Sequence, residues 1–206
     1  MYTPQAIGRV GGGNLANAGQ LKQMDATPTA VLNLYIGSFL VGADSALKVM
    51  DDAAASVSYV CVGLYESDGV TPVKKGYVTN AELDAGWTGF VRVMPIGDVI
   101  FVGEEDGDGG NISNANAGPG IYTDLMVAEP SAQELAIGNK TLGVEQPMPS
   151  IKIDSSAVNA SSSGLLIELL GLESTPDQPA DGTGHARKFR FKVISSAATY
   201  SQSANT

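Results

Sequence analysis

The sequence predicts an all-β protein, built as an antiparallel β-sandwich or β-barrel. Short apolar runs rich in β-branched and aromatic residues recur along the chain, as is typical of strands. Turn-forming residues lie between most of these runs, as in Ser67-Asp68-Gly69 and Asp181-Gly182. No amphipathic helical pattern separates the runs and no internal repeat occurs at a fixed period, which disfavours α/β folds, propellers and solenoids.

The first element is an extended N-terminal arm over residues 1–30. This stretch is rich in Gly, Asn, Gln and Ala and has neither the period of a strand nor that of a helix. Two interpretations are open: an arm that orders by lying across neighbouring subunits, or a disordered leader. Residues 31–195 form the predicted β domain, and the small polar residues of 196–206 form a C-terminal tail.

Within the β domain, eight apolar runs predict strands, and two short stretches are candidates for helices. The strands are expected at residues 31–41, 57–65, 89–94, 98–102, 122–127, 151–153, 165–170 and 187–194. The helix candidates are residues 43–55, where Asp44 and Ser45 are available as caps, and residues 131–137.

The last strand carries a basic stripe. Alternation places Phe189, Phe191 and Val193 on one face and Lys188, Arg190 and Lys192 on the other. The apolar face packs into the core. For the basic face two interpretations are open: a contact with an acidic neighbouring surface, or a solvated strand balanced by acidic residues of the same sheet.

Composition limits the classes of partner. The chain has 206 residues, 43% of them hydrophobic and 17% charged, which suits a globular core and excludes global disorder. Its net charge of -10 is the wrong sign for binding a nucleic-acid backbone. The N-terminus lacks the pattern of a secretory signal, and no apolar run is long enough to span a bilayer. We therefore expect no nucleic-acid and no membrane partner.

The sequence offers little catalytic chemistry, and we predict no catalytic, cofactor-binding or metal-binding residue and no cofactor. His185 is the only histidine and lies in a glycine-rich loop without a nucleophile elbow, so a hydrolase that uses it is the third-ranked hypothesis. Cys61 is the only cysteine and reads as a small buried hydrophobe in a strand. Trp87, at a strand entry, is typical of a core or edge anchor rather than a sugar platform.

The densest acidic cluster contains Glu104, Glu105, Asp106 and Asp108. Its order does not match an EF-hand loop, although oxygen-rich loops of this kind can bind calcium. A solvated hairpin turn and a loop that contacts a basic patch on a partner are the two interpretations, and calcium binding stays open.

The second half of the chain, from about Trp87 to Val193, carries a series of short motifs. They are a strand at 98–103 followed by an acidic turn, an aspartate-serine turn at 153–156, the Leu-Leu-Gly-Leu of 169–172, and Pro176-Asp177 in the following loop. In this order the motifs resemble those of the capsid cement or decoration proteins of tailed bacteriophages. The first half, including Gly11-Gly12-Gly13, matches no pattern of the family.

The resemblance implies a non-catalytic virion structural protein that is assembled in the host cytoplasm and binds the outside of the capsid. Its expected partners are the major capsid protein and further copies of itself, in a homo-oligomer such as a trimer. The alternative is a glycan-binding adhesin module of a head fibre or of the tail, which an aromatic-lined patch near Trp87 would favour.

Overall fold

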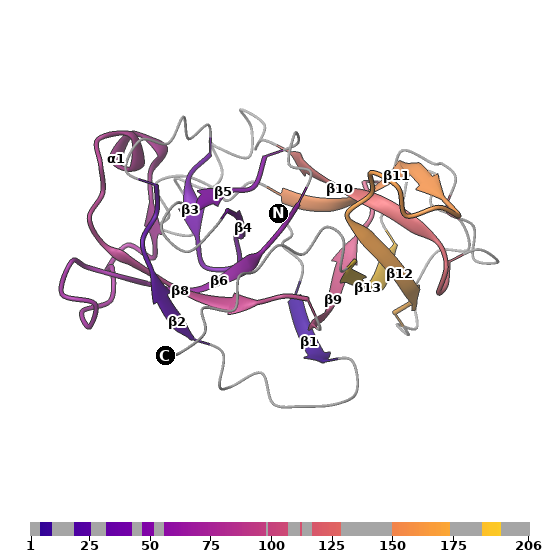
Figure 1. Ribbon diagram of the computed structural model, residues 1–206, viewed down its shortest axis with the longest axis horizontal. Coiled ribbons are helices and arrows are strands. Elements are labelled where there is room, and N and C mark those ends of the chain that lie inside the picture. The colour runs from indigo at the N-terminus through magenta and orange to yellow at the C-terminus, as the bar shows by residue number, and fades with distance from the viewer. Residues whose placement is uncertain are drawn as a thin grey trace. The chain divides into compact units, whose positions relative to one another are not determined.

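The computed structural model describes residues 5–9, 19–25, 32–42, 47–51, 56–97, 99–106, 112, 117–128, 150–173 and 187–194. These residues are mostly strands in antiparallel sheets, which confirms the all-β prediction (Figure 1). They divide into two compact units, one holding β2–β8 and the only described helix, the other holding β1 and β9–β13. The sequence led us to expect one domain over 31–195, but the units divide within that range, after Gly97.

The strands and the helix have the following bounds. They are β1 (Gln5–Arg9), β2 (Gln20–Lys22), β3 (Leu34–Tyr35), β4 (Phe39–Val41), β5 (Lys48–Val49), β6 (Tyr59–Tyr65), β7 (Tyr77–Val78), α1 (Asn80–Asp84), β8 (Phe90–Pro95), β9 (Val99–Glu104), β10 (Tyr122–Ala128), β11 (Ser150–Asn159), β12 (Ile167–Leu172) and β13 (Lys188–Val193).

The second unit is a closed barrel. Its sheet has the order β1-β9-β13-β12-β10-β11, with every neighbouring pair antiparallel. A parallel bridge between Glu105 and Ile153 joins β9 back to β11, where the Asp106 N–H donates to the Ile153 carbonyl at 3.0 Å. Strands β9 to β13 thus form a five-stranded barrel, the second barrel, and β1 lies on the outer edge of β9.

Alternation fills the second barrel with apolar side chains. Phe101 and Phe191 stack inside it with ring centroids 5.5 Å apart, and both are fully buried. Gly103 also faces inward, and a Cβ atom there would lie 2.7 Å from the Phe191 ring and 3.3 Å from Ile153. This close approach lets the large side chains meet at the barrel centre, as interior packing requires.

The first unit closes in the same way. Its main sheet has the order β2-β8-β6-β4-β5, again antiparallel throughout. A parallel bridge between Met24 and Leu47 joins β2 to β5, and the Asp25 N–H donates to the Leu47 carbonyl at 2.9 Å. We call this five-stranded closed sheet the first barrel. The β3–β7 ribbon and α1, which Thr79 and Glu82 start with a capping box, complete the unit.

The two barrels have one topology. When the five strands of each barrel are numbered in chain order, both read 1-5-4-2-3, with four antiparallel pairs and one parallel closure between strands 3 and 1. Both also carry a register shift at the same point of strand 4, where a glycine lies opposite an arginine of strand 5: Gly63 opposite Arg92, and Gly171 opposite Arg190. The chain therefore contains the same β module twice.

Turns and hydrogen bonds repeat as well. Before strand 2, Gly37 and Gly120 both have positive φ, at 98° and 86°. The next residue of each turn donates back to a carbonyl at 3.1 Å, Ser38 to Tyr35 in one barrel and Ile121 to Gly118 in the other. Only glycine adopts such φ values without strain, so the same turn demands it in both modules.

The repeat has no fixed period because the connections differ in length. The segment between strands 2 and 3 covers residues 42–47 in the first barrel and 129–149 in the second. That between strands 4 and 5 covers 66–89 in the first barrel and 173–187 in the second. Our expectation of no internal repeat at a fixed period thus missed a repeat of variable spacing.

The N-terminal residues differ from the expected arm. Strand β1 pairs with β9, and β2 is the first strand of the first barrel, paired with β8. Their backbone groups are satisfied in sheets even though their sequence lacks a strand period. Three residues of β2 are too few for such a pattern to be visible.

Two local predictions also need correction. Within the helix expected at 43–55, Lys48–Val49 is strand β5, because its backbone pairs with β4 to close the barrel. The aspartate-serine turn expected at 153–156 lies inside β11, which continues to Asn159. The helix expected at 131–137 and the tail at 196–206 lie outside the described residues.

Candidate functional site

The acidic cluster contains a buried ion pair. The Arg187 Nε lies 2.7 Å and its Nη2 lies 3.0 Å from the two carboxylate oxygens of Glu105, and both side chains are 1% exposed. The Arg187 backbone N–H donates to the same carboxylate at 3.0 Å, and its Nη2 also donates to the Ile112 carbonyl. This bidentate geometry satisfies both charges inside the end of the second barrel.

Two other members of the acidic cluster, Asp106 and Glu104, have neighbours within the fold. Asp106 accepts a hydrogen bond from the Ser155 hydroxyl at 2.6 Å, and Glu104 lies opposite Lys188 in the β9–β13 register. Asp108 lies outside the described residues. Among the residues that the structure describes, no group of three or more His, Cys, Asp or Glu side chains could hold a metal ion.

The ion pair was missed at the level of sequence, although a signal for it was present. The alternation that turns Phe189, Phe191 and Val193 inward places Arg187 on the same face, at the start of the strand. An arginine in phase with core residues needs a buried partner, and an acidic residue at the end of a neighbouring strand supplies it.

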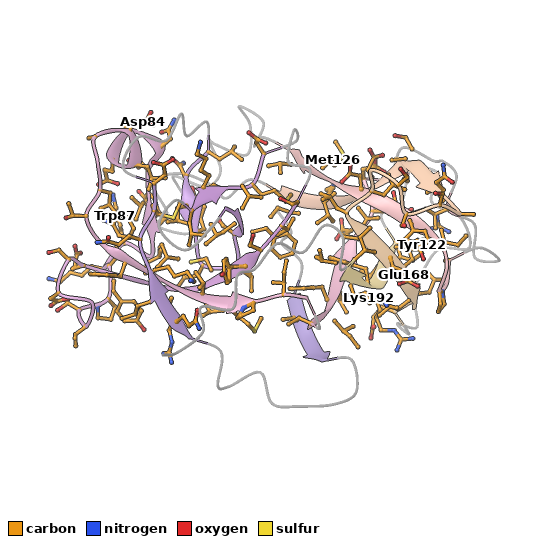
Figure 2. The ribbon with its side chains drawn as sticks, in the orientation of Figure 1. Asp84, Trp87, Tyr122, Met126, Glu168 and Lys192 are labelled. Carbon is orange, nitrogen blue, oxygen red and sulfur yellow. The ribbon has the colours of Figure 1, made fainter. Side chains whose placement is uncertain are left out.

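The basic stripe of β13 is balanced by acidic residues of the neighbouring strand and of the loop that follows it. Lys192 Nζ lies 2.8 Å from Glu168, its register partner on β12 (Figure 2), and Arg190 Nε lies 3.6 Å from Glu173. Burial opposes ionisation of Glu168, but hydrogen bonds from Lys192 and from the Gly120 N–H hold its pKa below the ordinary value. Of the two interpretations drawn from the sequence, a strand whose basic side chains are balanced by nearby acidic residues fits Lys192 and Arg190.

Cys61 and Trp87 are both part of the packing of the first unit. Cys61 is 1% exposed, and burial raises the pKa of its thiol to about 12, so it stays protonated and unreactive. Trp87 packs against the hydrophobic core of the first unit, as expected of an anchor (Figure 2). His185 lies outside the described residues.

What the described surface offers is an outward-facing row of side chains that both modules carry. In each module an arginine of strand 5 lies opposite the bulge glycine of strand 4 and opposite an apolar residue of strand 1. Such a row can contact a protein surface but contains no nucleophile or general base.

Neither a family model, nor a curated protein, nor a solved structure matches the chain. No helix in the described part of the chain is long and apolar enough to cross a membrane.

Proposed function

We propose that this chain is a virion structural protein that binds the outside of a tailed-phage capsid and stabilises it without catalysing a reaction. The observation that carries the proposal is the repeated module: one chain holds two barrels of the same topology and so carries two related outer faces. A capsid presents the same subunit many times, and two linked modules can bind two such subunits with an avidity that exceeds either single contact.

Three further features support this function. The second half of the chain resembles the capsid cement or decoration proteins, as the motifs of residues 98–103 and 169–172 indicate. The net charge of -10 disfavours contact with the packaged genome. Of the described candidates for chemistry, Cys61 is buried, Glu105 forms an ion pair with Arg187, and Asp106 accepts a hydrogen bond from Ser155. The proposed partners are the major capsid protein and further copies of the chain.

The proposal is tested by cosedimentation of the purified protein with capsids that lack it. Saturable binding at a stoichiometry that matches the capsid symmetry is the expected result, together with a higher temperature of capsid rupture. Capsids that already carry the protein are the matched control, because their sites are occupied. Absence of saturable binding would overturn the proposal, and binding to a glycan array instead would establish the adhesin alternative.

Removal of residues 1–30, a simple test for an accessory arm, is unsuitable here. It would delete β2, which the β2–β8 pairing and the Met24–Leu47 bridge make part of the first barrel. A truncated protein would lose capsid binding through unfolding, whatever the role of its N-terminus.

A further inference from the structure

The outward-facing row has the same pattern in both barrels. In the first, Leu21 of β2 lies opposite Arg92 of β8, and Val62 is the extra residue at the β6 bulge that Arg92 faces. In the second, the positions of Leu21, Arg92 and Val62 are taken by Val102, Arg190 and Leu170. Each row is thus apolar, arginine, apolar. Core packing does not dictate the two exposed arginines, so their agreement points to a use at the surface.

In the second barrel this row is engaged by the chain itself. Arg190 forms an ion pair with Glu173 at 3.6 Å. Val102 is only 8% exposed and lies opposite Gln5 of β1 on the other side of β9. A carboxylate of the same unit therefore pairs with the arginine of the row, and an added strand pairs with the strand that carries Val102.

In the first barrel the row is open. Leu21 is 48% exposed and Val62 is 37% exposed, and both are among the large exposed hydrophobic side chains of the described residues. Arg92 is also exposed, and no described residue forms an ion pair with it. The position that corresponds to Glu173 is Tyr65. A Cβ on Gly63 would lie 3.1 Å from the Tyr65 ring and 3.4 Å from the Arg92 Cβ, so both side chains flank this glycine.

The residues Leu21, Val62, Tyr65 and Arg92 form what we call the outer patch. Tyrosine and arginine are the residue types that contribute most to binding energy at protein interfaces, and adjacent aliphatic groups exclude water from them. We propose that the outer patch is the centre of a contact with a second copy of this chain. The inference deepens the proposed function and rests on it, since that function employs the chain as a homo-oligomer.

Local charge complementarity at the arginine favours a second copy as the occupant. The chain carries 22 acidic and 12 basic residues, so the surface of another copy offers carboxylates in excess. The second barrel shows the chemistry that such a contact would repeat, because a carboxylate of this same chain already pairs with the equivalent arginine. An arginine on an acidic protein also steers two copies into one relative orientation.

Sedimentation velocity of the full chain over a range of concentrations tests the inference. The wild-type protein should self-associate, and Arg92→Ala and Val62→Asp should each weaken association by about tenfold or more. Arg190→Ala is the matched control: it removes the equivalent arginine of the second barrel and should leave association within about twofold of wild type. Raising the salt concentration should narrow the difference in association between wild type and Arg92→Ala, because salt screens the attraction between Arg92 and a carboxylate. Circular dichroism verifies that each variant is folded.

A wild-type protein that stays monomeric at all concentrations, or an Arg92→Ala variant that associates as tightly as wild type, would overturn the inference. The same preparations are then cosedimented with capsids. A monomer that binds capsids saturably would remove the inference and leave the proposed function. A protein that associates through the outer patch but does not bind capsids would support the inference and overturn the proposed function.

Discussion

Replacing the buried ion pair of the second barrel should show that its two charges depend on each other. Glu105→Met leaves the Arg187 guanidinium buried without its carboxylate, and Arg187→Met leaves the carboxylate of Glu105 without its cation. Both side chains are 1% exposed, so water cannot replace the lost partner. Each single substitution should lower the free energy of unfolding by about 3–5 kcal/mol.

The double substitution should cost less than the sum of the two single ones. It removes both charges and fills the space with apolar side chains of similar length, an exchange that is often neutral for buried pairs. Two backbone groups lose their partners: the Arg187 N–H, which donates to Glu105, and the Ile112 carbonyl, which accepts from Arg187. The desolvation of each group costs about 1–3 kcal/mol, so the expected loss for the double variant is about 2–6 kcal/mol.

The first barrel supports this expectation because it closes without the pair. Counting along the matched strands, Met24 occupies the position of Glu105 and Gly89 that of Arg187. The ring of Trp87 fills the space beside Gly89, where a Cβ atom would lie 2.2 Å from it. The module therefore folds with either polar or apolar contacts at this end.

Urea unfolding followed by far-UV circular dichroism measures all three variants. For a slope of about 2 kcal/mol per molar urea, the single variants should each shift the midpoint by about 2 M and the double variant by about 1–3 M. Lys75→Met is the control, since Lys75 Nζ lies 2.6 Å from Glu82 on the surface and its loss should cost less than about 1 kcal/mol. A double variant whose loss equals the sum of the two single losses would refute the reasoning.

Three further predictions follow from the fold and the ionisable groups. Gly37→Ala and Gly120→Ala should each cost about 1–2 kcal/mol in urea unfolding, because both sites need a left-handed backbone; a loss at only one of them would contradict the equivalence of the modules. The lowered pKa of Glu168 stabilises the protein above its ordinary value of 4.5, and this contribution disappears as the pH falls through the folded-state value. The difference in unfolding free energy between wild type and Glu168→Gln should therefore be present at neutral pH and vanish in acid; a constant difference would exclude the linkage. With a pKa of about 12, Cys61 should react with a thiol reagent at pH 8 only as fast as the protein unfolds, and immediate labelling of the native protein would show an exposed thiol.

The central strands of each barrel could be predicted from the sequence, because each has enough residues for the pattern to be visible. The expected strands at 57–65, 89–94 and 122–127 correspond to β6, β8 and β10 within a few residues. Strands β2 and β5 could not be predicted in this way. They have three and two residues, and their pairing comes from barrel closure, a tertiary effect that local propensity does not encode.

The boundary between the units was missed for a related reason. The segment from β8 to β9 passes through Ile96 and Gly97, which read as an ordinary turn between two strands of one sheet. In the structure β8 pairs with β2 and β6, whereas β9 pairs with β1 and β13. Turn chemistry shows that a strand ends but not which strand it pairs with, so the division between barrels depends on long-range pairing.

Comparison of the two modules separates what the fold requires from what each barrel has acquired. Both keep the strand order, the positive-φ glycine before strand 2 and the glycine at the strand-4 bulge, since closure, the turn and the bulge depend on them. They differ at the barrel end, where the second barrel has Glu105 and Arg187 at the positions that Met24 and Gly89 occupy in the first, and in what contacts the outward-facing row. One row is engaged by Glu173, and the other presents Leu21 and Val62 to the surface. This divergence on a common fold leaves one outward-facing row paired within its own unit and the other row available to a partner.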